Sequence, residues 1–232
     1  MKTLKTLFAA ALCFAAFNVS AQTADEIVAK NITAMGGAEK LASLKSVKME
    51  GSLSTQGIDI PVTLTKVHLK GMRMDLEIMG TANYQLANET KGWVFMPIQQ
   101  MDAPQEMTAD QLKSTKSQMD IQGSLFNYKE KGYTVEYVST EKLSGGDAYK
   151  LKVVKNGETS FYFIDTQTNL LVKTTATREV NGQSMDLETV YTDYKKNADG
   201  FLFAYTNNTT QGNIVFDKIS TNVAVDEKIF TN

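Results

Sequence analysis

The 232-residue sequence contains only one Cys, one His, one Trp and three Pro. A zinc site of the Cys/His type needs three or four such ligands, so these counts exclude it. The formal net charge of −2 gives none of the basic excess that nucleic-acid-binding proteins carry, so nucleic acid is not an expected partner. Hydrophobic residues make up 42% of the chain and charged residues 22%, which are ordinary globular proportions and exclude disorder throughout.

Long apolar segments are also missing, except at the start of the chain. Lys2 and Lys5 precede the apolar residues 7–17, and the small residues of Val19-Ser20-Ala21 follow. This order is typical of a secretory signal peptide, so we predict export and cleavage after Ala21. Nothing in residues 22–232 is long and apolar enough to span a membrane as a helix.

The single Cys, Cys13, lies inside this predicted signal peptide. A lipid anchor on Cys13 is the alternative interpretation, but the bulky Leu12 before it does not suit a lipoprotein cleavage site. After cleavage, residues 22–232 contain no Cys, so their core forms without disulfides. Their length fits a single domain.

Helix signals occur at the start of the mature chain. Thr23 and Glu26 form a capping-box pattern, and Gly36-Gly37 marks the end of the predicted helix. A shorter helix is predicted over 38–44. From Val47 onward apolar and polar residues alternate, which indicates β-strands.

Turn signals then divide the chain into strands of similar length. Asn156-Gly157 predicts a hairpin between strands 148–155 and 158–164, and Asn181-Gly182 predicts one between 170–180 and 183–195. We therefore expect about ten consecutive antiparallel strands in one large meander sheet. Several strands are apolar on both sides. Either helices cover one face of the sheet, or the sheet curls around an apolar interior as an incomplete β-barrel.

An insertion at 97–120 interrupts the strands. Thr108 and Gln111 form a second capping-box pattern, which opens a helix predicted to run to about Asp120. Met96, Met101, Met107 and Met119 all fall in or beside the insertion, and Met suits surfaces that accept varied apolar ligands. The helix is either a movable lid or a fixed plug, and the sequence leaves both open.

Catalytic groups are scarce. His68 is the only candidate base, and its position on predicted strand 58–69 indicates an ordinary surface residue. Carboxylate pairs such as Asp75 and Glu77 lie on the polar side of an alternating strand. Since no Gly-rich phosphate loop is present either, the sequence favours a non-catalytic binding protein that uses no cofactor.

Several short segments resemble a known family. They are Ala24-Asp25-Glu26-Ile27-Val28, Gly36-Gly37-Ala38-Glu39-Lys40-Leu41, Gly92-Trp93, Phe161-Tyr162-Phe163-Ile164-Asp165, Asn169-Leu170-Leu171-Val172-Lys173, Asp193-Tyr194 and Gly200-Phe201-Leu202-Phe203. Their combination resembles the outer-membrane lipoprotein-sorting proteins of the LolA/LolB-like superfamily, over nearly all of residues 22–232.

The resemblance implies a half-open antiparallel β-barrel whose helices cover a lipid-accepting cavity. It implies a monomeric periplasmic carrier that shields an acyl chain, from a lipoprotein or another lipid, between an inner-membrane donor protein and an outer-membrane acceptor protein. It also implies an Arg that latches the lid, and this chain has only Arg73 and Arg178. A non-carrier envelope scaffold with the same fold, which would bind a protein partner, is the alternative.

The predicted ligand contacts come from apolar strand positions and from the insertion. They are Met72, Met74, Leu76, Ile78, Trp93, Phe95, Leu112, Met119, Phe161 and Phe163. An outer-membrane β-barrel would also show alternating strands, but the capped helices, the lack of aromatic girdles and the C-terminal Phe230-Thr231-Asn232 argue against it.

Overall fold

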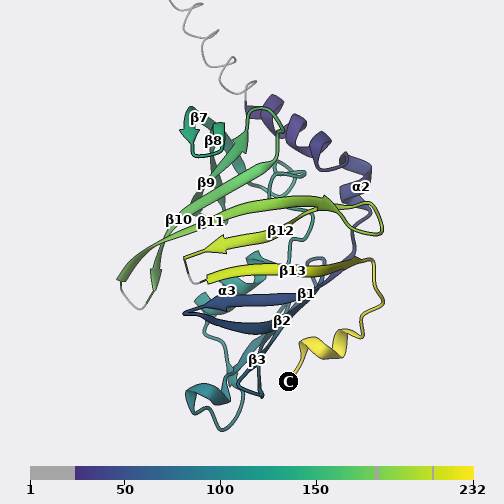
Figure 1. Ribbon diagram of the computed structural model, residues 1–232, viewed down its shortest axis with the longest axis vertical. Helices are drawn as coiled ribbons and strands as arrows, with labels where there is room; N and C mark the ends of the chain where they lie inside the picture. The colour runs from purple at the N-terminus through teal and green to yellow at the C-terminus, as the bar shows by residue number, and fades with distance from the viewer. Residues whose placement is uncertain (1–23, 181–182, 211) are drawn as a thin grey trace, which may run out of the picture. The chain divides into compact units, whose positions relative to one another are not determined.

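The computed structural model describes residues 24–180, 183–210 and 212–232. The predicted signal peptide with its cleavage site, the Thr23 cap and the Asn181-Gly182 turn lie outside these residues. The described chain is mainly β, with a few short helices, as predicted (Figure 1).

One antiparallel sheet contains the strands, in the order β6-β5-β4-β3-β2-β1-β13-β12-β11-β10-β9-β8-β7. The first six strands are β1 (Ser46–Thr55), β2 (Ile58–Val67), β3 (Gly71–Ile78), β4 (Thr81–Asn88), β5 (Gly92–Phe95) and β6 (Gln105–Glu106). The others are β7 (Thr134–Leu143), β8 (Gly146–Lys155), β9 (Glu158–Asp165), β10 (Leu171–Val180), β11 (Gln183–Lys196), β12 (Leu202–Thr209) and β13 (Gly212–Thr221).

The sheet consists of two meanders instead of the single one expected from the sequence. Strands β1–β6 form one and β7–β13 the other, and pairing between β1 and β13 joins them. The order begins at β6 and ends at β7, so the sheet is open. The prediction of a large antiparallel sheet that does not close is confirmed.

Helices occupy the positions that the capping patterns indicated. Residues 24–34 are helical, and α2 (Ala38–Ala42) follows after Gly36-Gly37. In the insertion, η1 (Pro97–Gln99) precedes α3 (Ala109–Ser117), and a further short helix, η2 (Glu227–Phe230), lies near the C-terminus. The Thr108 hydroxyl accepts from the Gln111 N–H at 3.3 Å, and the Gln111 side chain accepts from the Thr108 N–H at 2.9 Å, so the predicted capping box is confirmed.

The chain divides into two compact units. Unit 1 comprises the helical residues before Met35 together with Leu125–Glu188. The apolar side of its helix, with Ile27 and Val28, packs against strand residues such as Leu151 and Ile164, which are fully buried. This explains why strands β8 and β9 carry apolar residues on the side that faces the helix.

Unit 2 comprises Met35–Ser124 and Thr189–Asn232 and has two buried clusters. One cluster joins Val47, Tyr205, Phe216 and Ile219, with the partly buried Ile121 packed on it. The other contains Met72, Ala87 and Met119, with Leu64 and Leu112 packed against them. In both, residues of the insertion or of the segment after it cover strand residues.

Candidate functional site

The strand register defines which side chains of unit 2 share a face. Residues directly opposite one another in an antiparallel pair point to the same side. Met74 lies opposite Leu64 on β2 and Gln85 on β4. The Gln85 amide donates to the hydroxyl of Thr115 on α3 at 3.3 Å, so α3 covers this side. We call this side of β1–β5, β12 and β13 the α3 face.

Six of the ten predicted contacts belong to the α3 face or to the segment that covers it. Met72 and Met119 are fully buried in the same cluster, and Leu112 packs against that cluster. Met74, Leu76 and Ile78 follow Met72 at every second position of β3 and are only half-buried. Beyond the cover of α3, therefore, β3 offers a row of apolar side chains with accessible surface.

Trp93 and Phe95 lie on the opposite side of the sheet. Phe95 pairs with Tyr84 and Trp93 with Leu86, which in turn lie opposite Asp75 and Arg73. The Tyr84 and Phe95 rings are 5.5 Å apart. The ten predicted residues therefore do not form one continuous surface.

Phe161 and Phe163 belong to unit 1. They lie on the side of β9 that faces away from the helix of residues 24–34. Phe163 is buried and pairs with Lys150 and Lys173, whose ammonium groups lie 5.6 and 5.0 Å from its ring centre. The Lys150 ammonium also lies 4.9 Å from the Phe161 ring. Both rings are thus packed under lysine side chains, by cation–π contacts.

The α3 face includes apolar residues that the sequence prediction did not select. Met49, Leu53, Leu64, Phe203 and Ile214 are half-buried on β1, β2, β12 and β13. Alternation along each strand was the available signal. The pairing of β1 with β13 is what brings strands from the two ends of the sequence together, and no local pattern indicated it.

Contacts along its length hold the insertion on the sheet. The Met107 N–H donates to the Gly92 carbonyl at 2.8 Å, and the Met119 carbonyl accepts from the Leu69 N–H at 3.0 Å. Between these points the Lys66 and Lys116 ammonium groups donate to the Gln118 and Glu89 carbonyls at 3.0 and 2.7 Å. The helix α3 lies behind β13 and β1 in Figure 1.

Neither arginine takes part in holding α3. Arg73 pairs with Asp75 at 2.8 Å, and its guanidinium also donates to the Ile229 carbonyl at 3.4 Å. Arg178 pairs with Glu158 at 3.2 Å. The arginine latch that the resemblance implied is therefore not formed in the described residues, where lysines and amides hold the insertion instead.

His68 differs from its predicted setting. It lies in the turn after β2, half-buried, with Nδ1 3.8 Å from the Asp120 carboxylate, whose side chain is 3% exposed. The predicted strand 58–69 ends at Val67, before His68. His68 thus joins the β2–β3 turn to the end of the insertion.

Elsewhere in unit 2, charges are paired or at the surface. The Thr221 hydroxyl and N–H donate to Asp199 and lower the pKa of its carboxyl. Burial raises the pKa of the Tyr194 hydroxyl.

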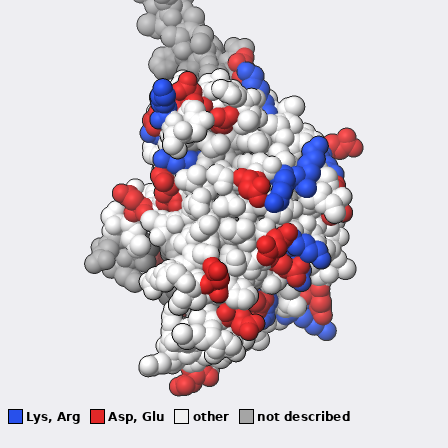
Figure 2. Space-filling model, viewed as in Figure 1, with Lys and Arg blue, Asp and Glu red and all other residues white. Residues whose placement is uncertain are grey.

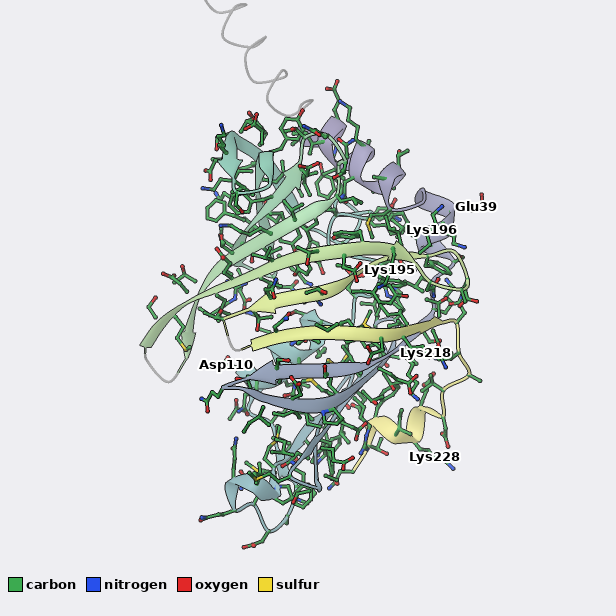
Figure 3. The ribbon with its side chains drawn as sticks, in the orientation of Figure 1. Glu39, Asp110, Lys195, Lys196, Lys218 and Lys228 are labelled. Carbon is green, nitrogen blue, oxygen red and sulfur yellow. The ribbon has the colours of Figure 1, made fainter. Side chains whose placement is uncertain are left out.

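In Figure 3 the labelled Lys195, Lys196 and Lys218 lie at the right-hand ends of β11 and β13, apart from Asp110 at the start of α3. On the visible surface in Figure 2, neither sign of charge forms a continuous patch.

Within the described ranges, no group of three or more His, Cys, Asp or Glu residues could hold a metal ion. The same part of the chain contains no helix that combines the length and apolar character needed to cross a lipid bilayer.

Solved structures share this arrangement of strands and helices. A LolA superfamily protein from Nitrosomonas europaea matches with a TM-score of 0.57 and 12% identity, over 92% of this chain and 98% of its own. The chain has the LolA fold. A domain from Vibrio parahaemolyticus described as an outer membrane lipoprotein-sorting protein matches with a TM-score of 0.54 and 16% identity, over 90% of this chain and 97% of its own.

A DUF1329 family protein from Desulfovibrio piger also matches, with a TM-score of 0.59 and 10% identity, over 90% of this chain and 97% of its own. No protein-family model and no curated protein matches the sequence. At these identities the likeness concerns the fold alone. The LolA resemblance that the sequence segments indicated is confirmed at that level.

Proposed function

We propose that this protein is an exported, periplasmic lipid-binding protein that shields an acyl chain against the α3 face, without catalysis. The observation that carries the proposal is the row Met74, Leu76 and Ile78, which is half-buried on β3. Its partners on β2 include the apolar Leu64 and Val62, whereas its partners on β4 are polar. Burial of an acyl chain contributes about 0.8 kcal/mol per CH₂ group, so one long chain is a substantial ligand.

The fold supports a more specific role for the lipid-binding protein, that of a lipid carrier. One neighbour is described as a lipoprotein-sorting domain, and lipoproteins carry acyl chains. A carrier would receive its ligand from an inner-membrane donor protein and pass it to an outer-membrane acceptor protein. The half-buried methionines of the face, Met49 and Met74, suit this role because unbranched thioether side chains adapt to different apolar shapes.

A scaffold that binds a protein partner is the second candidate, favoured by apolar side chains at hairpin tips. Met79, in the β3–β4 turn, is 81% exposed, and Ile58, at the start of β2, is 49% exposed. A scaffold would bind through these tips and would show no saturable uptake of a fatty acid.

Two substitutions on neighbouring strands test which side of the sheet binds the ligand. Met74→Glu places a carboxylate on the α3 face, whereas Phe95→Glu places one on the opposite face at a similarly half-buried position. We expect Met74→Glu to weaken the binding of a fluorescent fatty acid at least tenfold, because a charge in an apolar site must be desolvated. Phe95→Glu should leave binding within twofold of the unmodified protein.

Circular dichroism of both variants controls for folding. Equal losses of binding in the two folded variants would contradict the assignment of the ligand to the α3 face. Asp75→Ala, on the same strand as Met74 but facing away, serves as a further control and should also bind normally.

A further inference from the structure

An Asn side chain interrupts the apolar row at the β12 end of the α3 face. Leu53 on β1 pairs with Ile214 on β13, and Ile214 pairs with Asn207 on β12, so the three side chains share one side of the sheet. Tyr205, two positions away on the same strand, belongs to the buried cluster of this face. A carboxamide therefore lies beside the apolar side chains of Leu53, Ile214 and Tyr205 on this face.

The carbonyl oxygen of this carboxamide has no hydrogen-bond partner. Asn207 Oδ1 is buried, and it accepts no hydrogen bond from the described part of the chain. Buried polar side-chain atoms in folded proteins nearly always have a partner, and an exception calls for a specific explanation. Asn is also a poor strand former, so strand propensity does not favour it here.

Other polar side chains of the α3 face have structural partners. The Gln85 amide donates to Thr115, and the Lys66 ammonium donates to the Gln118 carbonyl. The Asn83 amide donates to the Thr81 carbonyl at 2.8 Å and accepts from the Ile98 N–H at 3.4 Å. These three side chains hold the insertion or their own strand in place. The carbonyl oxygen of Asn207, in contrast, accepts no hydrogen bond within the described residues.

We propose that Asn207 accepts a hydrogen bond from the head of the bound lipid, and so selects acyl ligands that carry an N–H or O–H donor beside the chain. The inference rests on the proposed lipid-binding function. The residue is half-buried overall, and the χ2 torsion of Asn is broad, so a rotation of the amide presents Oδ1 to a ligand on this face. The acyl chain would then extend over Leu53 and Ile214 toward β3.

The chain offers a matched control in Asn213. Its Oδ1 is likewise buried without a partner among the described residues. Asn213 precedes Ile214 on β13 and pairs with Ser54, so its side chain points to the opposite side of the sheet. Any effect of removing an unpartnered carbonyl oxygen should appear at both positions, whereas an effect on ligand selection should appear only at Asn207.

The test compares three probes on residues 22–232 and on the variants Asn207→Leu and Asn213→Leu. N-methyloleamide carries an amide N–H donor, monoolein carries hydroxyl donors, and methyl oleate has the same acyl chain without a donor. The unmodified protein should bind at least one donor probe about fivefold more tightly than methyl oleate, the size of effect that one net hydrogen bond gives. Which donor probe is preferred identifies the head group as amide or hydroxyl.

In Asn207→Leu this preference should fall to about onefold while methyl oleate still binds, and in Asn213→Leu it should persist. Thermal unfolding should show both variants at least as stable as the unmodified protein, since each loses a buried carbonyl oxygen that has no hydrogen-bond partner. Equal binding of all three probes by the unmodified protein overturns the role of Asn207, as does a preference that survives in Asn207→Leu or disappears in Asn213→Leu. If no probe binds at all, the lipid-binding function itself fails, and this inference with it.

Discussion

Single residues determine how closely the two meanders join. Gly51 lies where β1 meets β13, next to an irregularity in the register between Glu50 and Gly51. A Cβ atom at Gly51 would lie 2.0 Å from the Val215 carbonyl oxygen and 2.7 Å from the Phe216 Cα. Because both neighbours are backbone atoms, they cannot move aside as the end of a side chain could.

Gly51→Ala should therefore destabilise the protein by about 3 kcal/mol, the upper part of the range for overpacked sites. Urea unfolding monitored by circular dichroism measures the change. Gly145→Ala is the control, since a Cβ there meets nothing within 4 Å, and its unfolding midpoint should stay close to that of the unmodified protein. A Gly51→Ala protein as stable as Gly145→Ala would contradict the close approach of β1 and β13.

Residue types and their local spacing were enough to predict several features correctly. Asn156 and Gly157 both have positive φ, 52° and 81°, as the turn of the predicted hairpin requires. Alternation over Met72–Ile78 indicated the correct shared face on β3. These features depend on neighbours in the sequence, which is why a single sequence reveals them.

The facing of β5 relative to β3 could not be obtained in this way. It depends on the registers of two successive hairpins, through Met79-Gly80 and Glu89–Lys91, and a one-residue shift in either reverses it. The sequence prediction therefore grouped Trp93 and Phe95 with Met74, although they point to opposite sides. The pairing of β1 with β13 could not be predicted from local patterns either, because it joins residues far apart in the chain.

At the scale of elements, the helix α3 that covers the α3 face is mostly exposed. Thr115 is its only buried residue, and most of its other side chains are exposed. Leu112 and the polar contacts of Gln85, Lys66 and Lys116 attach it to the sheet, and the Thr108 capping box stabilises the helix itself. A helix held this way is stable in place but opens at a lower free-energy cost than the buried strands.

Thr108→Ala removes the cap and should lower the local stability of α3 by about 1 kcal/mol. Hydrogen exchange of the amides in Ala109–Ser117 should then accelerate about fivefold, while exchange in β8 and β9 stays unchanged. Ser114→Ala, at an exposed α3 position, is the matched control and should not accelerate exchange, since Ala favours the helix. Unchanged exchange in Thr108→Ala would show that packing, and not the cap, holds α3.

At the scale of the whole molecule, the chain combines the LolA fold with a face whose apolar side chains are not fully buried by the protein's own helices. Contact of water with apolar side chains such as Met74, Leu76 and Ile78 raises the free energy of the protein. A lipid-binding function explains this arrangement, because a bound acyl chain would complete the burial. The scaffold alternative leaves it unexplained.

Native mass spectrometry tests this central claim most directly. Residues 22–232 would be exported in a Gram-negative host, purified without detergent, and their bound species released and identified. The account predicts a co-purifying lipid or lipopeptide at a defined stoichiometry, which Met74→Glu removes. A ligand-free protein that also takes up no fluorescent fatty acid would contradict the account and favour the scaffold.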